Sequence, residues 1–139
     1  MALSGSFPST LNGRAEHVAI AVNGRIYVGL GDDGGQVFRD WWRFDPADQS
    51  WMHLADFPGN GRARAFVFAI GSMIYVGGGD IRHSSILRDV YVYEIPNARW
   101  QRVADLPFEL TGAAGTSDGH YGYLFGGANY LGYLSTLLR

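Results

Sequence analysis

The charged side chains of this sequence that could do chemistry lie between apolar runs, and most of them are arginine or aspartate. Carboxylates and imidazoles can accept and donate protons, and a guanidinium group binds a carboxylate through two parallel hydrogen bonds. The residues that these properties make candidates for contact with a ligand are Arg14, Asp32, Asp33, Arg62, Arg64, Asp80, Arg82 and His83. They could bind a polar or charged partner, with proton transfer as an alternative use.

Several other chemistries are excluded by residue type and spacing. The sequence has no cysteine, which rules out disulfides, thiolate zinc sites and cysteine nucleophiles. Its four histidines show neither H-x-H nor H-E-x-x-H spacing, and no G-x-S-x-G serine motif is present. Asp32 and Asp33 are adjacent on one loop, which is a poor arrangement for a tuned acid and base. We therefore expect no metal site, no cofactor and no catalytic group of these kinds.

The elements that must position the candidates form a repeat. Tyrosines and glycines mark matching points of three units at a spacing of 48 residues: Tyr27, Tyr75 and Tyr123, then Gly31, Gly79 and Gly127. A fixed period of this length predicts a repeat architecture in which each unit is one supersecondary element. The dipeptides Arg39-Asp40 and Arg88-Asp89 also recur in phase, so we expect them to be structural.

Short apolar runs separated by turn signals predict four strands in each complete unit. The expected strands span residues 17–22, 25–29, 40–45 and 51–55, then 65–70, 73–77, 89–94 and 100–104, then 113–117 and 121–125. Asn23-Gly24 is a two-residue hairpin signal. The period places a further strand near Leu137, in a final stretch whose pattern is ambiguous, and no helix is evident.

The repeat divides the chain into units. Residues 1–13 read as the tail of a preceding repeat, because Phe7-Pro8 matches the closing dipeptide Phe57-Pro58. Residues 14–61 and 62–110 are two complete units, and residues 111–139 are the first half of a third.

Strand direction predicts where the candidate residues gather. Strands alternate in direction, so the links from second to third strand and from one unit to the next emerge on the same face. All eight candidates fall on these links, whereas the other face carries tight turns. For Arg14 and Arg62 an alternative stays open, in which they brace neighbouring loops through salt bridges and carbonyl hydrogen bonds.

The repeated pattern resembles the kelch repeat: in the second unit it reads R-x-x-A, an apolar strand, I-Y-V-x-G-G, a variable loop, R-D-x-x-x-Y, a turn and Trp. The resemblance covers roughly Arg14 to Gly127 and looks closest to bacterial galactose-oxidase-like and cell-surface kelch proteins. It implies an all-β fold of kelch-type β-propeller blades. About two and a half four-stranded antiparallel blades would form an open arc rather than a closed ring. The sequence departs from the pattern at Leu30-Gly31, where the first glycine of the pair is missing.

Two functions follow from the resemblance. The leading one is an interaction module that binds a protein or glycan partner through the loops on one face. The alternative is part of a carbohydrate-active enzyme similar to the kelch-like sialic-acid mutarotases and epimerases, so whether the chain is an enzyme stays open. Proton transfer there would need a carboxylate or arginine, and Asp80 with Arg62 is the best local candidate. The copper site of galactose-oxidase relatives needs a cysteine, which these residues lack.

The composition of the 139 residues restricts partners and location. The net charge is −2 and no basic run supplies a phosphate-binding surface, so we expect no nucleic-acid partner. No apolar run approaches the length of a membrane span, and the first ten residues lack the features of a signal peptide. The location stays open: cytoplasmic if the chain is complete, exported if it is a fragment.

An open arc would leave strand edges and one apolar blade face uncovered. The favoured explanation is that the chain is a fragment whose remaining blades complete the ring. Homo-oligomerisation into a composite ring and a stable arc within a larger assembly are the alternatives. We expect the isolated chain to self-associate or aggregate.

Overall fold

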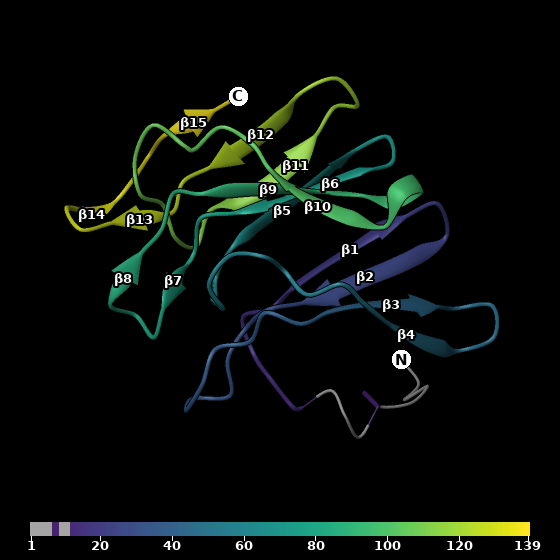
Figure 1. Cartoon of the computed structure of the whole chain (residues 1–139). Helices are drawn as coiled ribbons and strands as arrows, with labels where there is room; N and C mark the ends of the chain where they lie inside the picture. Colours follow the sequence, from purple (N-terminus) through teal and green to yellow (C-terminus); the bar gives the residue numbers. More distant parts are fainter. Residues whose placement is uncertain (1–6, 9–11) are drawn as a thin grey trace, which may run out of the picture.

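The chain is all-β, with its antiparallel sheets arranged in a fan (Figure 1). The computed structural model describes residues 7–8 and 12–139. Within these ranges the one helical element is a single 3-10 turn, η1 (Ile95–Asn97). A search of the same residues finds no helix with the length and hydropathy that crossing a membrane requires.

The first sheet has its four strands side by side in chain order. They are β1 (Val18–Val22), β2 (Arg25–Gly29), β3 (Trp41–Asp45) and β4 (Ser50–Leu54). Asn23 and Gly24 join the first two strands, and both have positive φ, 52° and 77°. This is the backbone that a tight hairpin needs, and the reason that Asn-Gly predicts one. The strand bounds lie within one or two residues of those expected from the sequence.

The second sheet repeats the first, and the third contains three strands. The second is made of β5 (Phe66–Ile70), β6 (Met73–Gly77), β9 (Val90–Glu94) and β10 (Arg99–Arg102). The third is made of β11 (Ala114–Ser117), β12 (Gly122–Phe125) and β15 (Leu137–Leu138). Leu138 pairs with Leu124 and Leu137 with Phe125. The further strand that the period places near Leu137 is therefore confirmed.

The stretches expected to be irregular loops contain two small hairpins. They are formed by β7 (Asp80–Ile81) with β8 (Ser85–Ile86), and by β13 (Ala128–Asn129) with β14 (Gly132–Tyr133). In the first unit the matching loop has an isolated bridge between Asp32 and Val37. The sequence did not predict these pairings because two-residue strands carry no readable alternation.

The first strands of the sheets lie together, and the loops divide between two faces. β1 contacts β5, and β5 contacts β11. Figure 1 shows the small hairpins β7–β8 and β13–β14 on the left, with the tight turns after β1, β5 and β11 on the right. This division agrees with the one expected from strand direction.

Apolar side chains fill the spaces between neighbouring sheets. Between the first and second sheets, the cluster includes Val18, Tyr27, Trp41, Ile74 and Tyr93, with Trp41 and Ile74 fully buried. A second cluster, between the second and third sheets, is built around Phe66, Val90, Leu110 and Leu124. Burial of this kind, face against face, is what makes neighbouring blades of a repeat stabilise one another.

The three repeated tyrosines take matching places in the strands. Tyr27 pairs in register with Ile20, Tyr75 with Phe68 and Tyr123 with Thr116. Tyr27 is buried against Trp41 and Tyr93, so it packs between sheets as expected. Tyr75 and Tyr123 are partly exposed. Their strand positions repeat, while the depth of burial differs between the units.

Phe7 occupies a place that corresponds to Phe57. The Phe57 ring packs edge-on against Trp100, with ring centroids 5.1 Å apart. The Phe7 ring packs edge-on against Trp51, the counterpart of Trp100, at 5.7 Å. Residues 1–6 and 9–11 lie outside the described residues, and the assignment of residues 1–13 to the tail of a preceding repeat stays a prediction. The unit boundaries themselves stay predictions.

A glycine at the end of each second strand is required by the approach of another backbone. Gly31, Gly79 and Gly127 have φ of 90°, 84° and 92°. A Cβ on Gly79 would lie 2.6 Å from the Ala63 carbonyl oxygen. Leu30 adopts the same left-handed backbone as Gly78, with φ of 61° and 59°. Its side chain is buried in the first core cluster, and this burial offsets a strain of about 1–2 kcal/mol.

Candidate functional site

Arg14 and Arg62 form matching ion pairs beneath the loop face. Arg62 is fully buried, and its guanidinium donates to both carboxylate oxygens of Asp89 at 2.7 and 2.9 Å. Arg14 binds both oxygens of Asp40 at 2.5 and 2.9 Å. Each arginine also donates to a backbone carbonyl, that of Gly78 or Leu30, at 3.0 Å. This geometry favours the bracing alternative for both residues, and contact with a ligand stays a prediction.

These pairs lower the pKa of their aspartates. Burial by itself would raise the pKa of Asp40 and Asp89, but the hydrogen bonds and charge of the paired arginine outweigh it. The aspartates of the repeated Arg-Asp dipeptides thus hold the arginine that begins each unit. Leu110 takes the arginine's place in the third unit and is buried in the second core cluster.

A row of left-handed residues links the units near their first strands. Glu16, Arg64 and Gly112 are 48 residues apart and have φ of 54°, 55° and 69°. The Arg64 N–H donates to the Glu16 carbonyl at 3.0 Å, and the Gly112 N–H donates to the Arg64 carbonyl at 2.9 Å. The side chains of Glu16 and Arg64 meet on the loop face, where Arg64 Nη1 donates to Glu16 Oε2.

Asp80 is a buried charge that is fully partnered. Only 1% of the residue is exposed. Its carboxylate pairs with the Arg64 guanidinium and accepts hydrogen bonds from the His83 backbone N–H at 2.8 Å and the Thr111 hydroxyl at 2.5 Å. Asp80 thus pairs with Arg64, whereas Arg62, the partner expected from the sequence, is held by Asp89. Asp80 therefore holds Arg64 in place, and its contact with a ligand stays a prediction.

Arg64 connects this carboxylate to two more exposed groups. Its Nη1 lies 2.7 Å from Glu16 Oε2 and 3.1 Å from His83 Nε2. A guanidinium only donates, so Nε2 accepts in this contact and the imidazole proton is on Nδ1. The cluster of Glu16, Arg64, Asp80 and His83 can hold an imidazole and a carboxylate at fixed places, which is what proton transfer requires.

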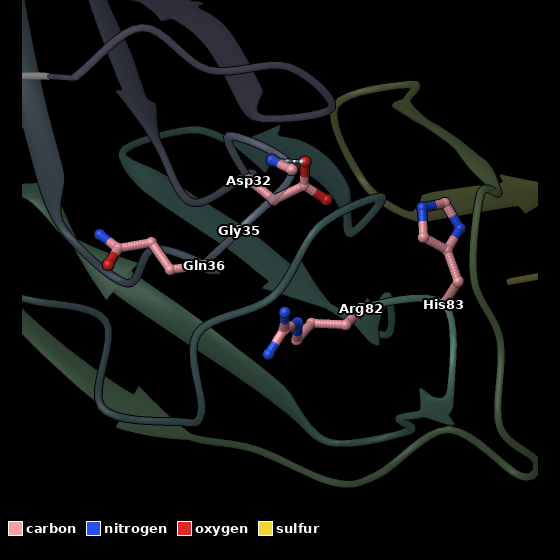
Figure 2. A pocket seen from close by; sticks show the side chains of 6 residues that line it. Asp32, Gly35, Gln36, Arg82 and His83 are labelled. Atoms are coloured by element: carbon pink, nitrogen blue, oxygen red, sulfur yellow. Dashed lines mark hydrogen bonds between the residues drawn. The ribbon is translucent and has the colours of Figure 1, made fainter.

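Two hollows open on the loop face, with His83 between them. The first, of 270 Å³, is lined by Asp32, Gly34, Gly35, Gln36, Arg82 and His83. Figure 2 shows its side chains, with Asp32 and Gln36 from the first unit and Arg82 and His83 from the second. The second hollow, of 370 Å³, includes Glu16, Arg64, His83, Thr111 and Tyr133 in its lining. Because His83 lines both, one ligand could contact both hollows.

Arg82 and His83 form the strained tip of the β7–β8 hairpin. Their φ values are 54° and 60°, and the Ser84 N–H closes the turn on the Ile81 carbonyl at 3.1 Å. Positive φ at both central positions favours Asn-Gly, so side chains here cost stability. Strain of this kind often marks functional positions. Arg82 is exposed, and its guanidinium forms no ion pair with any residue that the structure describes.

The other two candidate aspartates, Asp32 and Asp33, are more exposed than Asp80. Asp33 is exposed, and hydrogen bonds from the backbone N–H groups of Gln36 and Gly35 lower its pKa. It therefore stabilises its own loop. Asp32 is partly exposed and accepts a hydrogen bond from the Gly34 N–H at 3.2 Å, with the rest of its carboxylate at the first hollow.

The structure adds Glu16, Gln36, Thr111 and Tyr133 to the residues around the hollows. Only Glu16 had a clear signal in the sequence, because it lies one period before Arg64. Thr111 follows Ala63 by one period, but the residue type changes from apolar to polar. Gln36 and Tyr133 lie on variable loops, where the repeat gives no guide to side-chain direction.

One group of possible metal ligands occurs among the described residues. Ligand atoms of Glu16, Asp32 and His83 lie within 4.8 Å of one another. The Arg64 guanidinium contacts two of the three, and its positive charge opposes a cation there. The arrangement fits an organic ligand with several polar groups better than an ion.

The fold and the hollowed loop face together define a protein built from part of a β-propeller. A model of the N-acetylneuraminate epimerase family matches residues 7–138, so the chain belongs to that family. Curated N-acetylneuraminate epimerases are similar to it. The one from Yersinia enterocolitica is 36% identical over 129 residues, 84% of this chain and 32% of the relative. The one from Pasteurella multocida is 28% identical over 135 residues, 93% and 35% of the two chains. The chain thus spans about a third of these relatives' length.

Proposed function

We propose that this chain supplies part of the sugar-binding face of a kelch-type propeller that acts on N-acetylneuraminate. The observation that carries the proposal is the placement of an exposed cation beside a proton-transfer group. Arg82 has no ionic partner among the described residues, and the adjacent His83 is held by Arg64 beside Glu16. The names of the relatives support the substrate class.

The chemistry of the sugar fits this placement. N-acetylneuraminate carries a carboxylate and a hydroxyl on the same anomeric carbon. A carboxylate bound to the Arg82 guanidinium through two hydrogen bonds would place that hydroxyl beside the neighbouring residue, His83. The ligand class therefore matches the order of groups on the hairpin tip.

Epimerisation at the anomeric carbon needs only proton transfers. A base removes the proton of the anomeric hydroxyl, a carbonyl forms, and the ring C–O bond breaks as an acid protonates the ring oxygen. Rotation of the open chain and attack of the same oxygen on the other carbonyl face give the second epimer. We assign Glu16 as the base and Arg82 as the carboxylate ligand, with His83, Arg64 and Asp80 as positioning residues, because His83 Nε2 already accepts a hydrogen bond from Arg64.

The interaction-module function remains a second proposal. The same exposed hairpin tips could present Asp32 and Arg82 to a glycan on a partner. A binding module would bind the sugar without changing the exchange rate of its epimers, and this difference separates the two functions.

The test is a variant of the hairpin tip that removes the two side chains proposed to bind the sugar. The residues that replace them favour the conformation of the turn. Arg82→Asn with His83→Gly gives the turn its preferred residues, so we expect equal or higher stability to denaturant. We expect wild type to accelerate exchange between the two epimers of N-acetylneuraminate, followed by NMR exchange spectroscopy. The double variant should lose the acceleration and bind the sugar at least tenfold more weakly, because a charged hydrogen bond is worth about 1.5–3 kcal/mol.

The matched control is Arg25→Ala. Arg25 is an exposed arginine at the opposite end of the blade, paired with Asp45, and its loss should leave binding and exchange unchanged. Equal exchange rates with and without wild-type protein would contradict the epimerase assignment. Unchanged binding by the double variant would contradict the assignment of the site.

A further inference from the structure

The three loops that follow the second strands end in matching tips of different chemistry. At one period's spacing, the tips are Gly34-Gly35, Arg82-His83 and Tyr130-Leu131. The first tip has no side chains, the second carries charged and polar side chains, and the third carries apolar ones. A face that places a cation beside an apolar tip can distinguish parts of a ligand that is charged at one end and apolar at another.

The third hairpin exposes its apolar side chains to an unusual degree. Tyr130 is 64% exposed, Leu131 94% and Tyr133 98%. An aromatic ring exposed to this extent gains nothing from packing in this chain. Tyr133 also lines the 370 Å³ hollow, together with Arg64 and His83.

The hairpin is fixed in place rather than free to turn away. The Tyr130 hydroxyl accepts a hydrogen bond from the Ile86 N–H of the second unit's hairpin at 2.8 Å. At its base, the Thr111 and Ala128 backbones exchange hydrogen bonds of 2.9 and 2.8 Å. Figure 1 shows the two hairpins projecting from the same side. The backbone that carries Tyr133 therefore loses little freedom when a ligand binds.

From this placement we propose that Tyr133 is a specificity-determining residue whose ring packs against the acylamino group of the sugar. The inference rests on the proposed function. In N-acetylneuraminate the acetamido group lies across the ring from the carboxyl-bearing carbon. With the carboxylate at Arg82 and the anomeric centre at His83, the acetamido methyl lies toward the second hollow. Tyr133 supplies the apolar surface there, and Thr111 and Gly112 line the same hollow.

The test compares two sugars and three forms of the chain. The sugars are N-acetylneuraminate and its analogue with a hydroxyl group in place of the acetamido group. Wild type should bind N-acetylneuraminate about two- to tenfold more tightly than the analogue, the range that one aromatic contact provides. Tyr133→Ala should remove this preference and leave affinity for the analogue unchanged. Tyr133→Phe should keep the preference, because the ring and not the hydroxyl makes the contact.

The control is Tyr121→Ala, which removes a half-exposed tyrosine from the turn face. It should change neither affinity. If wild type prefers N-acetylneuraminate and Tyr133→Ala keeps that preference, the role of Tyr133 is wrong and the proposed function stands. If wild type binds neither sugar, the proposed function fails and this inference with it.

Discussion

Replacement of Arg62 by alanine is expected to lower the free energy of unfolding by about 3–5 kcal/mol, the cost of breaking a buried ion pair. The side chain is fully buried, and its loss leaves the Asp89 carboxylate and the Gly78 carbonyl without their donor. Since small domains have only about 5–15 kcal/mol of stability in total, much of the folded population should be lost. Chemical denaturation followed by tryptophan fluorescence measures the change.

Two comparisons isolate the ion pair. Arg25→Ala removes an exposed arginine paired with Asp45 and should cost less than about 1 kcal/mol. Arg62→Lys keeps the charge but cannot bind both carboxylate oxygens at once. Its free energy of unfolding should therefore lie between those of wild type and Arg62→Ala. Equal stability of Arg62→Ala and Arg25→Ala would show that the pair does not hold the loops.

At acid pH, the difference in the free energy of unfolding between wild type and Arg62→Ala should become smaller. Because the folded-state pKa of Asp89 is lowered, its stabilising effect is complete above the unfolded value of about 3.9. The effect is lost as pH falls through the folded value, where the carboxylate takes up a proton. The two denaturation curves should therefore approach each other below about pH 4. A difference that stays constant down to about pH 2 would contradict this assignment.

Replacement of Gly79 by alanine should have the second largest effect. Its φ of 84° is left-handed, and a Cβ there would meet the Ala63 carbonyl oxygen at 2.6 Å. Backbone strain of about 1–2 kcal/mol adds to a contact that only movement of the neighbouring loop can relieve. We expect a total loss of roughly 2–4 kcal/mol in the free energy of unfolding. The shift of the denaturation midpoint reports it.

Gly24→Ala separates the two causes. Gly24 also has a positive φ, 77°, but no atom lies within 4 Å of an added Cβ. This variant should suffer only the backbone strain, so its free energy of unfolding should fall by about 1–2 kcal/mol. If both variants lose the same amount, the close approach of backbones at Gly79 does not contribute.

The fold could be predicted from the sequence because its signals repeat. Asn23-Gly24 predicted a hairpin, the tyrosine spacing predicted matching strand positions, and the period predicted the strand β15 at Leu137–Leu138. The hairpins β7–β8 and β13–β14 could not be predicted, since two-residue strands depend on contacts with neighbouring units. Leu30 likewise shows that burial can hold a side chain in a backbone conformation that favours glycine.

The candidate site could be predicted only in part. Strand direction placed Asp32, Arg82 and His83 on one face, and the structure brings them to one hollow. Sequence spacing did not show that Arg62 is buried while Arg64, two residues later, reaches Glu16 and His83. The difference between Arg62 and Arg64 depends on the direction in which each side chain points, and the positive φ of Arg64 could not be read from the sequence.

The most direct test of the proposed sugar site is a titration of the isotope-labelled chain with N-acetylneuraminate, followed through backbone amide resonances. We expect the largest shifts at Glu16, Arg64, Arg82, His83 and Thr111, which surround the two hollows on the loop face. Amides of the opposite turns, at Gly24, Gly71 and Gly119, should stay in place. Shifts centred on those turns, or no shifts at saturating sugar, would contradict the claim that this repeat scaffold presents a sugar-binding site on its loop face.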